Sequence, residues 1–300
     1  MLHVNYTKCQ LLIILGLLFF ADYTRAQEPV KIAVWGDSRE NADKGTEQVI
    51  SLLKYEQANW DFQVHTGDFT HAGKEVDWKR SLAYIGMKDV YIPEKFFMCT
   101  SNHDDIQYTY DKYTKGVLPV NDTDNTTHFY AHRQGNVHVL FMDAYFTEPE
   151  VMQKWLDDYL AKNVKKDDWL IGVWHNPCYG DVTYKDDYLE VCAGWLDSFY
   201  KYGGDFILHG HAHVYLRSKP VAPDGSIDMK NGMVHIVSGV GGASWKDPLP
   251  YAEKTAYTPD VKSFPAVSFL KLDGNTATVR TLDARPDQNR RVIDEWTWKK

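Results

Sequence analysis

The stretch that decides the fold of this chain is Phe206-Ile207-Leu208-His209-Gly210-His211-Ala212-His213. It opens with a short apolar run of the kind that forms a buried strand, and a glycine then introduces two histidines two positions apart. Side chains with this spacing point the same way along an extended chain, so His211 and His213 would present their rings together. The stretch therefore predicts a strand that delivers two imidazoles to one site.

The same arrangement occurs four more times, earlier in the chain. Each polar cluster follows an apolar run rich in β-branched or aromatic residues, which is better explained as a buried strand than as a helix. These clusters are Gly36-Asp37, Gly67-Asp68, Asn102-His103-Asp104 and His175-Asn176. In α/β sheets the functional site lies beyond the carboxyl ends of the strands, where all five clusters would fall.

The side chains in the clusters are typical metal ligands. Asp, Asn and His offer oxygen and nitrogen donors that suit Mg, Mn, Zn or Fe, and the absence of Cys argues against a closed structural zinc site. Two divalent ions about 3.5 to 4 Å apart can stabilise the attacking and leaving oxygens of a phosphoryl transfer. Such a pair needs a bridging carboxylate, for which Asp68 is the candidate. We therefore predict a two-metal hydrolase site.

Strand and helix patterns alternate through the first two thirds of the chain. Helical spacing of apolar residues predicts helices over residues 42–59, 74–85, 148–161 and 186–202. Beyond residue 210 the pattern predicts strands over 233–238, 266–272, 276–282 and 292–298, the second and third joined by the turn Asp273-Gly274-Asn275. The polar segment 108–127 is predicted to be a surface loop. With no repeat and no long linker, a single domain over residues 27–300 is the economical interpretation.

The first 26 residues have the pattern of a secretory signal peptide. Lys8 precedes the apolar run 11–20, and Thr24-Arg25-Ala26 places small residues for cleavage after Ala26. A membrane anchor is the weaker alternative, since this run falls short of the ~20 residues that span a bilayer. We therefore expect a secreted or periplasmic protein without stable membrane insertion.

Composition and cysteine content are consistent with an exported globular protein. The formal net charge of -8 and an ordinary 44% of hydrophobic residues do not favour nucleic acid or anionic membrane as partners. Three cysteines follow the cleavage site. Cys99 lies within a strand pattern and is expected to be a buried thiol. Cys178 and Cys192 would form a disulfide that braces the segment after His175.

The five clusters resemble the calcineurin-like metallophosphoesterases, whose blocks run D-x-H, G-D, G-N-H-[DE], a lone H, and G-H-x-H. Four of the five match in order and spacing between Asp37 and His213. Within that superfamily the chain is most similar to the purple acid phosphatases, through residues 210–217, the glycine-rich loop of 234–242 and the closing hairpin after Phe269. The resemblance implies a four-layer α/β/β/α sandwich with two mixed β-sheets.

The resemblance also implies a role for each cluster residue. The implied metal ligands are Asp37, Asp68, Asn102, His175, His211 and His213. Asp37 and His213 would bind the first ion, Asp68 would bridge, and the remaining ligands would bind the second ion. His103 would lie just outside the ligands, where it could contact phosphate oxygen or protonate the leaving group, with Asp104 orienting it.

The first cluster departs from the family pattern. It has Asp37-Ser38-Arg39 where a histidine ligand is usual, and His71 where the purple acid phosphatases have a metal-binding tyrosine. An imidazole at position 71 would replace the missing ligand, but the phenolate that colours Fe(III) is absent, so Fe, Mn and Zn are all compatible. Arg39 would either bind phosphate beside the metals or pair with Glu40 or Asp43.

These patterns and the resemblance together predict an exported phosphoesterase. It would hydrolyse small phosphomonoesters with two divalent or mixed-valence ions and a metal-bridging hydroxide as nucleophile. One alternative is a phosphodiesterase that acts on nucleotides or lipid headgroups. Another is a non-catalytic protein that binds a phosphate ligand on the same fold, with the charge of Arg39 in place of the first ion.

Overall fold

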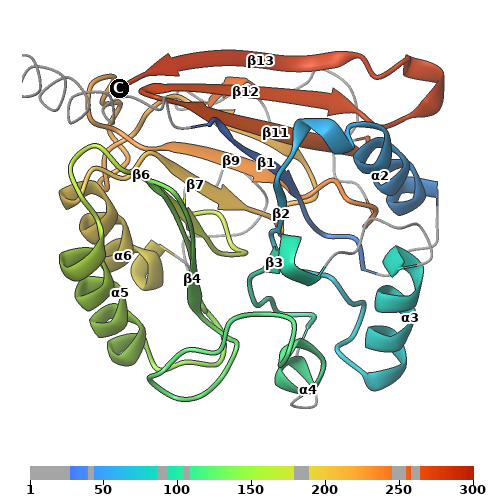
Figure 1. Ribbon diagram of the computed structural model, residues 1–300, viewed down its shortest axis with the longest axis horizontal. Helices are drawn as coiled ribbons and strands as arrows, with labels where there is room; N and C mark the ends of the chain where they lie inside the picture. Colours follow the sequence, from blue (N-terminus) through green and yellow to red (C-terminus); the bar gives the residue numbers. More distant parts are fainter. Residues whose placement is uncertain are drawn as a thin grey trace, which may run out of the picture.

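Two β-sheets face each other and carry helices on their outer sides (Figure 1). This computed structural model describes residues 28–39, 44–86, 93–104, 109–178, 189–244, 255–257 and 264–300. The predicted signal peptide lies outside these residues. In the described part of the chain, no helix is long and apolar enough to cross a membrane.

The first sheet has six strands in the order β13-β12-β11-β1-β2-β3. Its parallel part consists of β1 (Val30–Trp35), β2 (Phe62–His65) and β3 (Phe96–Met98). Its antiparallel part consists of β11 (Ala266–Asp273), β12 (Thr276–Asp283) and β13 (Val292–Lys299). The connecting helices α2 (Lys44–Tyr55) and α3 (Glu75–Gly86) flank this sheet in Figure 1. The predicted hairpin turns at Gly274, whose φ of +59° glycine adopts readily.

The second sheet has seven strands in the order β10-β8-β9-β7-β6-β5-β4. They are β4 (Tyr130–Gln134), β5 (Val137–Phe141), β6 (Trp169–Val173), β7 (Phe206–His209), β8 (Tyr215–Ser218), β9 (Val234–Ser238) and β10 (Thr255–Tyr257). The strands β5, β6, β7 and β9 run parallel. Helices α5 (Pro149–Asn163) and α6 (Leu189–Lys201) pack together over its outer face (Figure 1).

The central strands of the second sheet are buried on both faces. Val139 of β5 contributes to the core between the two sheets, whereas its neighbour Leu140 packs in the core beneath α5 and α6. On β6, Ile171 lies in the core between the sheets and Leu170 in the core beneath α5 and α6. Strands covered on both sides have near-continuous apolar sequences. This burial explains why the apolar runs before the clusters were visible in the sequence.

The predicted four-layer sandwich with two mixed sheets is confirmed, and the predicted helices are present with shifted ends. The assignment of residues 108–127 to a surface loop was only partly correct, since residues 122–125 are exposed but other parts are helical and buried. That segment contains the short helix α4 (Tyr110–Thr114), and Tyr110 is fully buried. Its polar groups are satisfied internally, since Asp111 Oδ1 accepts 2.8 Å hydrogen bonds from both the backbone N–H and the hydroxyl of Thr127. Parts of a polar segment can therefore be buried when their hydrogen bonds are formed within the segment itself.

The two cysteines expected to form a disulfide lie side by side but are free thiols in this structure. Cys178 and Cys192 are buried and linked by a thiol hydrogen bond, and Trp174 Nε1 donates to Cys178 Sγ at 3.1 Å. Burial raises the pKa of the Cys178 thiol well above its usual range. Because oxidation and exchange proceed through the thiolate, the raised pKa keeps the Cys178 thiol in its unreactive form.

We expect none of Cys99, Cys178 and Cys192 to react with a soluble aromatic disulfide reagent in the native protein at neutral pH. All three are buried, and burial also raises the pKa of Cys99. Peptide mapping after unfolding without reductant should then find all three modified. Modification of Cys99 alone would show instead that the other two had already formed a disulfide.

Candidate metal centre

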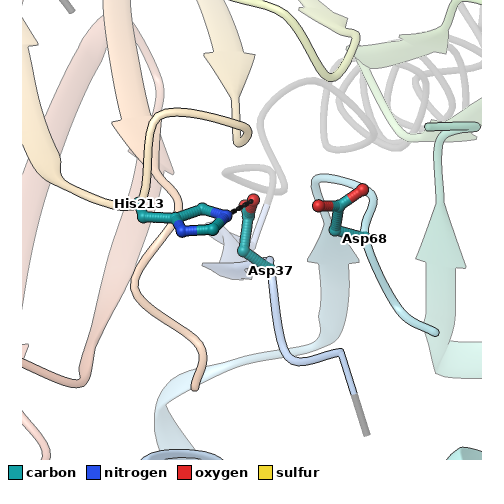
Figure 2. A group of neighbouring side chains, drawn as sticks. All are labelled: Asp37, Asp68 and His213. Carbon is teal, nitrogen blue, oxygen red and sulfur yellow. Dashed lines mark ion pairs between the residues drawn. The ribbon is translucent and has the colours of Figure 1, made fainter. Parts of the chain in front are cut away.

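The loops at the carboxyl ends of the strands bring three buried side chains together. Figure 2 shows Asp37, Asp68 and His213 converging from the segments that follow β1, β2 and β7. One ligand atom from each lies within 4.8 Å of the others. Carboxylate oxygen and imidazole nitrogen are suitable donors for a divalent cation, so the residues present fit a metal site.

The backbone of these loops is bent so that the side chains converge. Asp37, Asp68 and His213 all have left-handed backbones, with φ of +57°, +55° and +53°. Residues other than glycine rarely adopt such angles, and each costs of order 1 kcal/mol unless the surroundings enforce it. Asp37 N–H donates to the Gly67 carbonyl at 2.9 Å, which joins the first loop to the second.

Two glycines are required by the close approach of these loops. A Cβ on Gly210 would lie 2.4 Å from Asp37 Oδ2. A Cβ on Gly67, whose φ is +88°, would lie 2.7 Å from His175 Nδ1. Any side chain at either position would push a predicted ligand away. The glycines that precede Asp68 and His211 are thus part of the site's construction.

The two best-anchored histidines present the same ring atom to the carboxylates. His175 Nδ1 donates to the Thr66 carbonyl at 2.7 Å, and its Nε2 lies 3.2 Å from Asp68 Oδ1. His213 Nδ1 donates to the Ser244 carbonyl at 2.6 Å, and its Nε2 lies 3.5 Å from Asp37 Oδ1. Because a carbonyl can only accept, Nδ1 carries a proton in both rings. This arrangement is typical of metal-ligating histidines, whose other ring nitrogen is anchored in the same way.

The buried carboxylates make the site strongly electronegative. Burial, reinforced by Asp68, raises the pKa of the Asp37 carboxyl to about 7. Burial opposes ionisation of Asp68 as well, but the charges of His175 and Arg39 outweigh it and hold its pKa well below the usual range. Burial alone would lower the pKa of His175, yet Asp68 raises it to about 9. The buried anions thus demand a cation, which a proton or a metal ion can supply.

Arg39 has a different partner from either of those considered in the sequence. Its Nε and Nη2 lie 2.8 Å and 2.6 Å from Asp68 Oδ2, and the side chain is 20% exposed. Glu40 and Asp43 lie outside the described residues. The guanidinium is therefore held on the carboxylate that was predicted to bridge two metals, and it provides a fixed positive charge inside the site.

The remaining candidate ligands lie around the buried group. The His211 N–H donates to both oxygens of Asp37 at 2.9 Å and 3.1 Å, and its ring centroid is 5.0 Å from that of His175. Asn102 and His71 are exposed. His71 lies beside His103, with the ring centroids 6.1 Å apart, and does not belong to the group of three.

His103 and Asp104 are adjacent in sequence but have separate environments. His103 Nδ1 donates to the His71 carbonyl at 2.5 Å. The buried Asp104 accepts from Thr70 N at 2.7 Å and Phe69 N at 3.2 Å, and within the described residues none of its hydrogen bonds goes to the His103 ring. Asp104 therefore fixes the loop that carries Asp68, and the His71 backbone orients His103.

Sequence reasoning missed a sixth loop at this edge, which follows β5. The buried Asp143 accepts from Thr100 Oγ1 at 2.6 Å and from Tyr145 N at 3.0 Å, which fixes the turn. The Tyr145 ring centroid lies 6.4 Å from that of His175, and the next residue, Phe146, is 40% exposed. The signal was present, because a polar residue follows a strand-like apolar run here as it does in the five clusters.

Comparison with known families agrees with this geometry. The family described as calcineurin-like phosphoesterase matches residues 30–215, which is more than half of the chain. The chain belongs to the calcineurin-like phosphoesterases.

Its similarity to curated proteins points within that family toward acid phosphatases. It is 27% identical to Purple acid phosphatase 15 of Arabidopsis thaliana over 52% of this chain and 30% of that protein. It is 23% identical to Acid phosphatase type 7 of Homo sapiens over 88% of this chain and 66% of that protein. The chain thus spans less than two thirds of the length of these relatives.

Solved structures share the fold at low sequence identity. A purple acid phosphatase from yellow lupin (Lupinus luteus) seeds superposes with a TM-score of 0.73 at 16% identity, over 91% of this chain and 54% of that one. The Plasmodium protein GAP50, described as the anchor in the inner membrane complex, superposes with a TM-score of 0.65 at 15% identity, over 90% of this chain and 89% of that one.

The burial of His213 and the exposure of His71 predict different effects on metal binding. His213→Ala should weaken binding of Mn²⁺ or Zn²⁺ at least tenfold in calorimetric titration, because it removes a member of the buried group. His71→Ala, the matched control, should retain the metal content of the unsubstituted protein in elemental analysis. Loss of one equivalent in His71→Ala would instead identify His71 as a ligand.

Proposed function

We propose that this protein is a metal-dependent phosphoesterase that hydrolyses phosphomonoesters, as an exported protein with one catalytic domain over residues 27–300. The buried group of Asp37, Asp68 and His213, in a chain of the calcineurin-like phosphoesterase family, is the observation that carries the proposal. The similarity to acid phosphatases supports a monoester substrate, and the predicted signal peptide supports export.

Two ions, drawn from Fe, Mn or Zn, would be held by the cluster residues. The proposed ligands are Asp37, His213 and Asp68 for the first ion, and Asp68, Asn102, His175 and His211 for the second. When bound, the ions supply positive charge for the phosphoryl oxygens and lower the pKa of water toward neutrality. The anchored Nδ1 atoms of His175 and His213 leave the Nε2 atoms facing Asp68 and Asp37, where they would be available as ligands.

Side chains of the protein would protonate the leaving group and stabilise the negative charge of the phosphoryl group. With Nδ1 bonded to the His71 carbonyl, His103 retains Nε2 for proton transfer to the leaving oxygen. Arg39 would bind a phosphoryl oxygen from its position on Asp68, because five donors allow one guanidinium to serve both anions. Asp104 contributes by holding the loop of Asp68 in place.

A non-catalytic phosphate-binding protein on the same fold is the second candidate. The observation that favours it is the pair of contacts from Arg39 to Asp68 Oδ2, since a guanidinium there competes with a metal ion for the bridging oxygen. In that case the arginine replaces the first ion and binds phosphate without turnover. A phosphodiesterase with the same metal centre would differ from the first candidate only in the substrate that it hydrolyses.

Turnover and metal content together distinguish these candidates. We expect about two ions per chain and hydrolysis of p-nitrophenyl phosphate in preference to bis(p-nitrophenyl) phosphate. Asp68→Asn should abolish both metal retention and activity, because the amide cannot supply the anionic bridge. One ion or none, with phosphate binding but no hydrolysis under any of Fe²⁺, Mn²⁺ or Zn²⁺, would establish the binding protein. Preference for the diester would establish the phosphodiesterase.

Arg39→Gln tests whether the guanidinium restrains metal binding. The substitution should tighten binding of Mn²⁺ about tenfold in calorimetric titration, because the ion no longer competes with an ion pair on Asp68. It should also raise the KM for aryl phosphate. Arg133→Gln, which alters an exposed arginine on β4, is the matched control. Unchanged metal affinity in Arg39→Gln would show that guanidinium and ion occupy Asp68 without competition.

A further inference from the structure

A second concave site lies at the end of the second sheet opposite the metal centre. The metal-site loops follow the carboxyl ends of β6 and β7, whereas this cavity is lined by the loops that precede β6, β7 and β9 and by the end of β13. Its volume is about 650 Å³, which is within the range of small-molecule sites. No residue of the metal centre contributes to its walls.

The walls of this cavity are basic, although the protein is acidic overall, with a formal net charge of -8. Lys165, Lys166, Lys201, Lys230 and Lys300 line it. Lys300 is neutralised, since its Nζ lies 2.9 Å from the buried Asp205 Oδ2 and donates to the Asp168 carbonyl. The other four are exposed, and none forms an ion pair with any residue that the structure describes. Their charges are therefore available to a ligand.

The cavity also has a rigid aromatic side. Trp298 is half-buried and packs edge-on against Trp169 and Phe206, with ring centroids 6.1 Å and 5.9 Å away. Tyr202 is half-buried as well, with Lys201 Nζ 5.4 Å from its ring centroid. Anchored rings of this kind offer faces for stacking that lose little conformational freedom on binding.

We propose that this cavity binds a small ligand that combines phosphate groups with an aromatic ring, of the nucleoside polyphosphate class. Four ammonium groups without an ion-pair partner among the described residues, one at the end of α6 and three on two loops, can surround two or more phosphates, while Trp298 and Tyr202 border the aromatic ring. The concave shape favours a small molecule over a flat anionic membrane. This site is separate from the metal centre, and the inference does not depend on hydrolysis there.

Calorimetric titration with ADP tests the proposal on the full-length protein in EDTA, so that no hydrolysis occurs. We expect ADP to bind and to quench tryptophan fluorescence. Charge reversal by Lys201→Glu and Lys230→Glu should each weaken ADP binding at least tenfold, and Trp298→Leu should weaken it while leaving pyrophosphate binding unchanged. Lys95→Glu makes the same change in net charge at an exposed position just before β3 and should have no effect.

Three results would overturn this assignment. The first is the absence of ADP binding to the unsubstituted protein. The second is binding that Lys201→Glu and Lys230→Glu leave intact. The third is that pyrophosphate binds as tightly as ADP, which would leave the aromatic ring without a role. Circular dichroism of each variant separates lost binding from lost folding.

Discussion

The ionised carboxylate of Asp68 is the constraint on which the rest of the site depends. It is fully buried, with Arg39 on one oxygen and His175 facing the other. A buried charge without such partners would cost several kcal/mol, so the surrounding loops must keep cations within reach. The Asp104 carboxylate fixes the loop of Asp68, and the Thr66 carbonyl turns His175 toward it. The geometry around one anion thus explains contacts from four different loops.

The strained loops are possible because the strands beneath them are rigid. Asp37, Asp68, His211 and His213 all have positive φ, and each follows a strand that is buried along all or nearly all of its length. Strain of this kind persists only where the surroundings over-determine the backbone. The two hydrophobic cores on either side of the second sheet supply that support, while the loops carry the chemistry.

Much of this architecture was predictable from local sequence, because buried parallel strands are continuous apolar runs and the clusters mark their ends. The pairing of β1 with the distant β11 was not, since no local pattern encodes a partner more than two hundred residues away. The same limit applied to side chains. For Arg39 the sequence suggested either phosphate or the neighbouring acids Glu40 and Asp43, whereas its partner Asp68 is 29 positions away. The fold of residues 109–127 depended on hydrogen bonds that composition does not reveal.

Because β6 and β7 are buried on both faces, they should be among the last parts of the molecule to unfold. Amides that are hydrogen-bonded in a sheet and covered by two cores exchange with solvent only in the largest, least frequent unfolding events. His175 and the Gly-His-Ala-His segment follow these strands directly, within a few residues of the amides that should exchange most slowly with solvent. Fluctuations that release α4 or the edge strands would therefore leave the candidate metal-binding histidines in place, so that local unfolding and loss of the site are separate events.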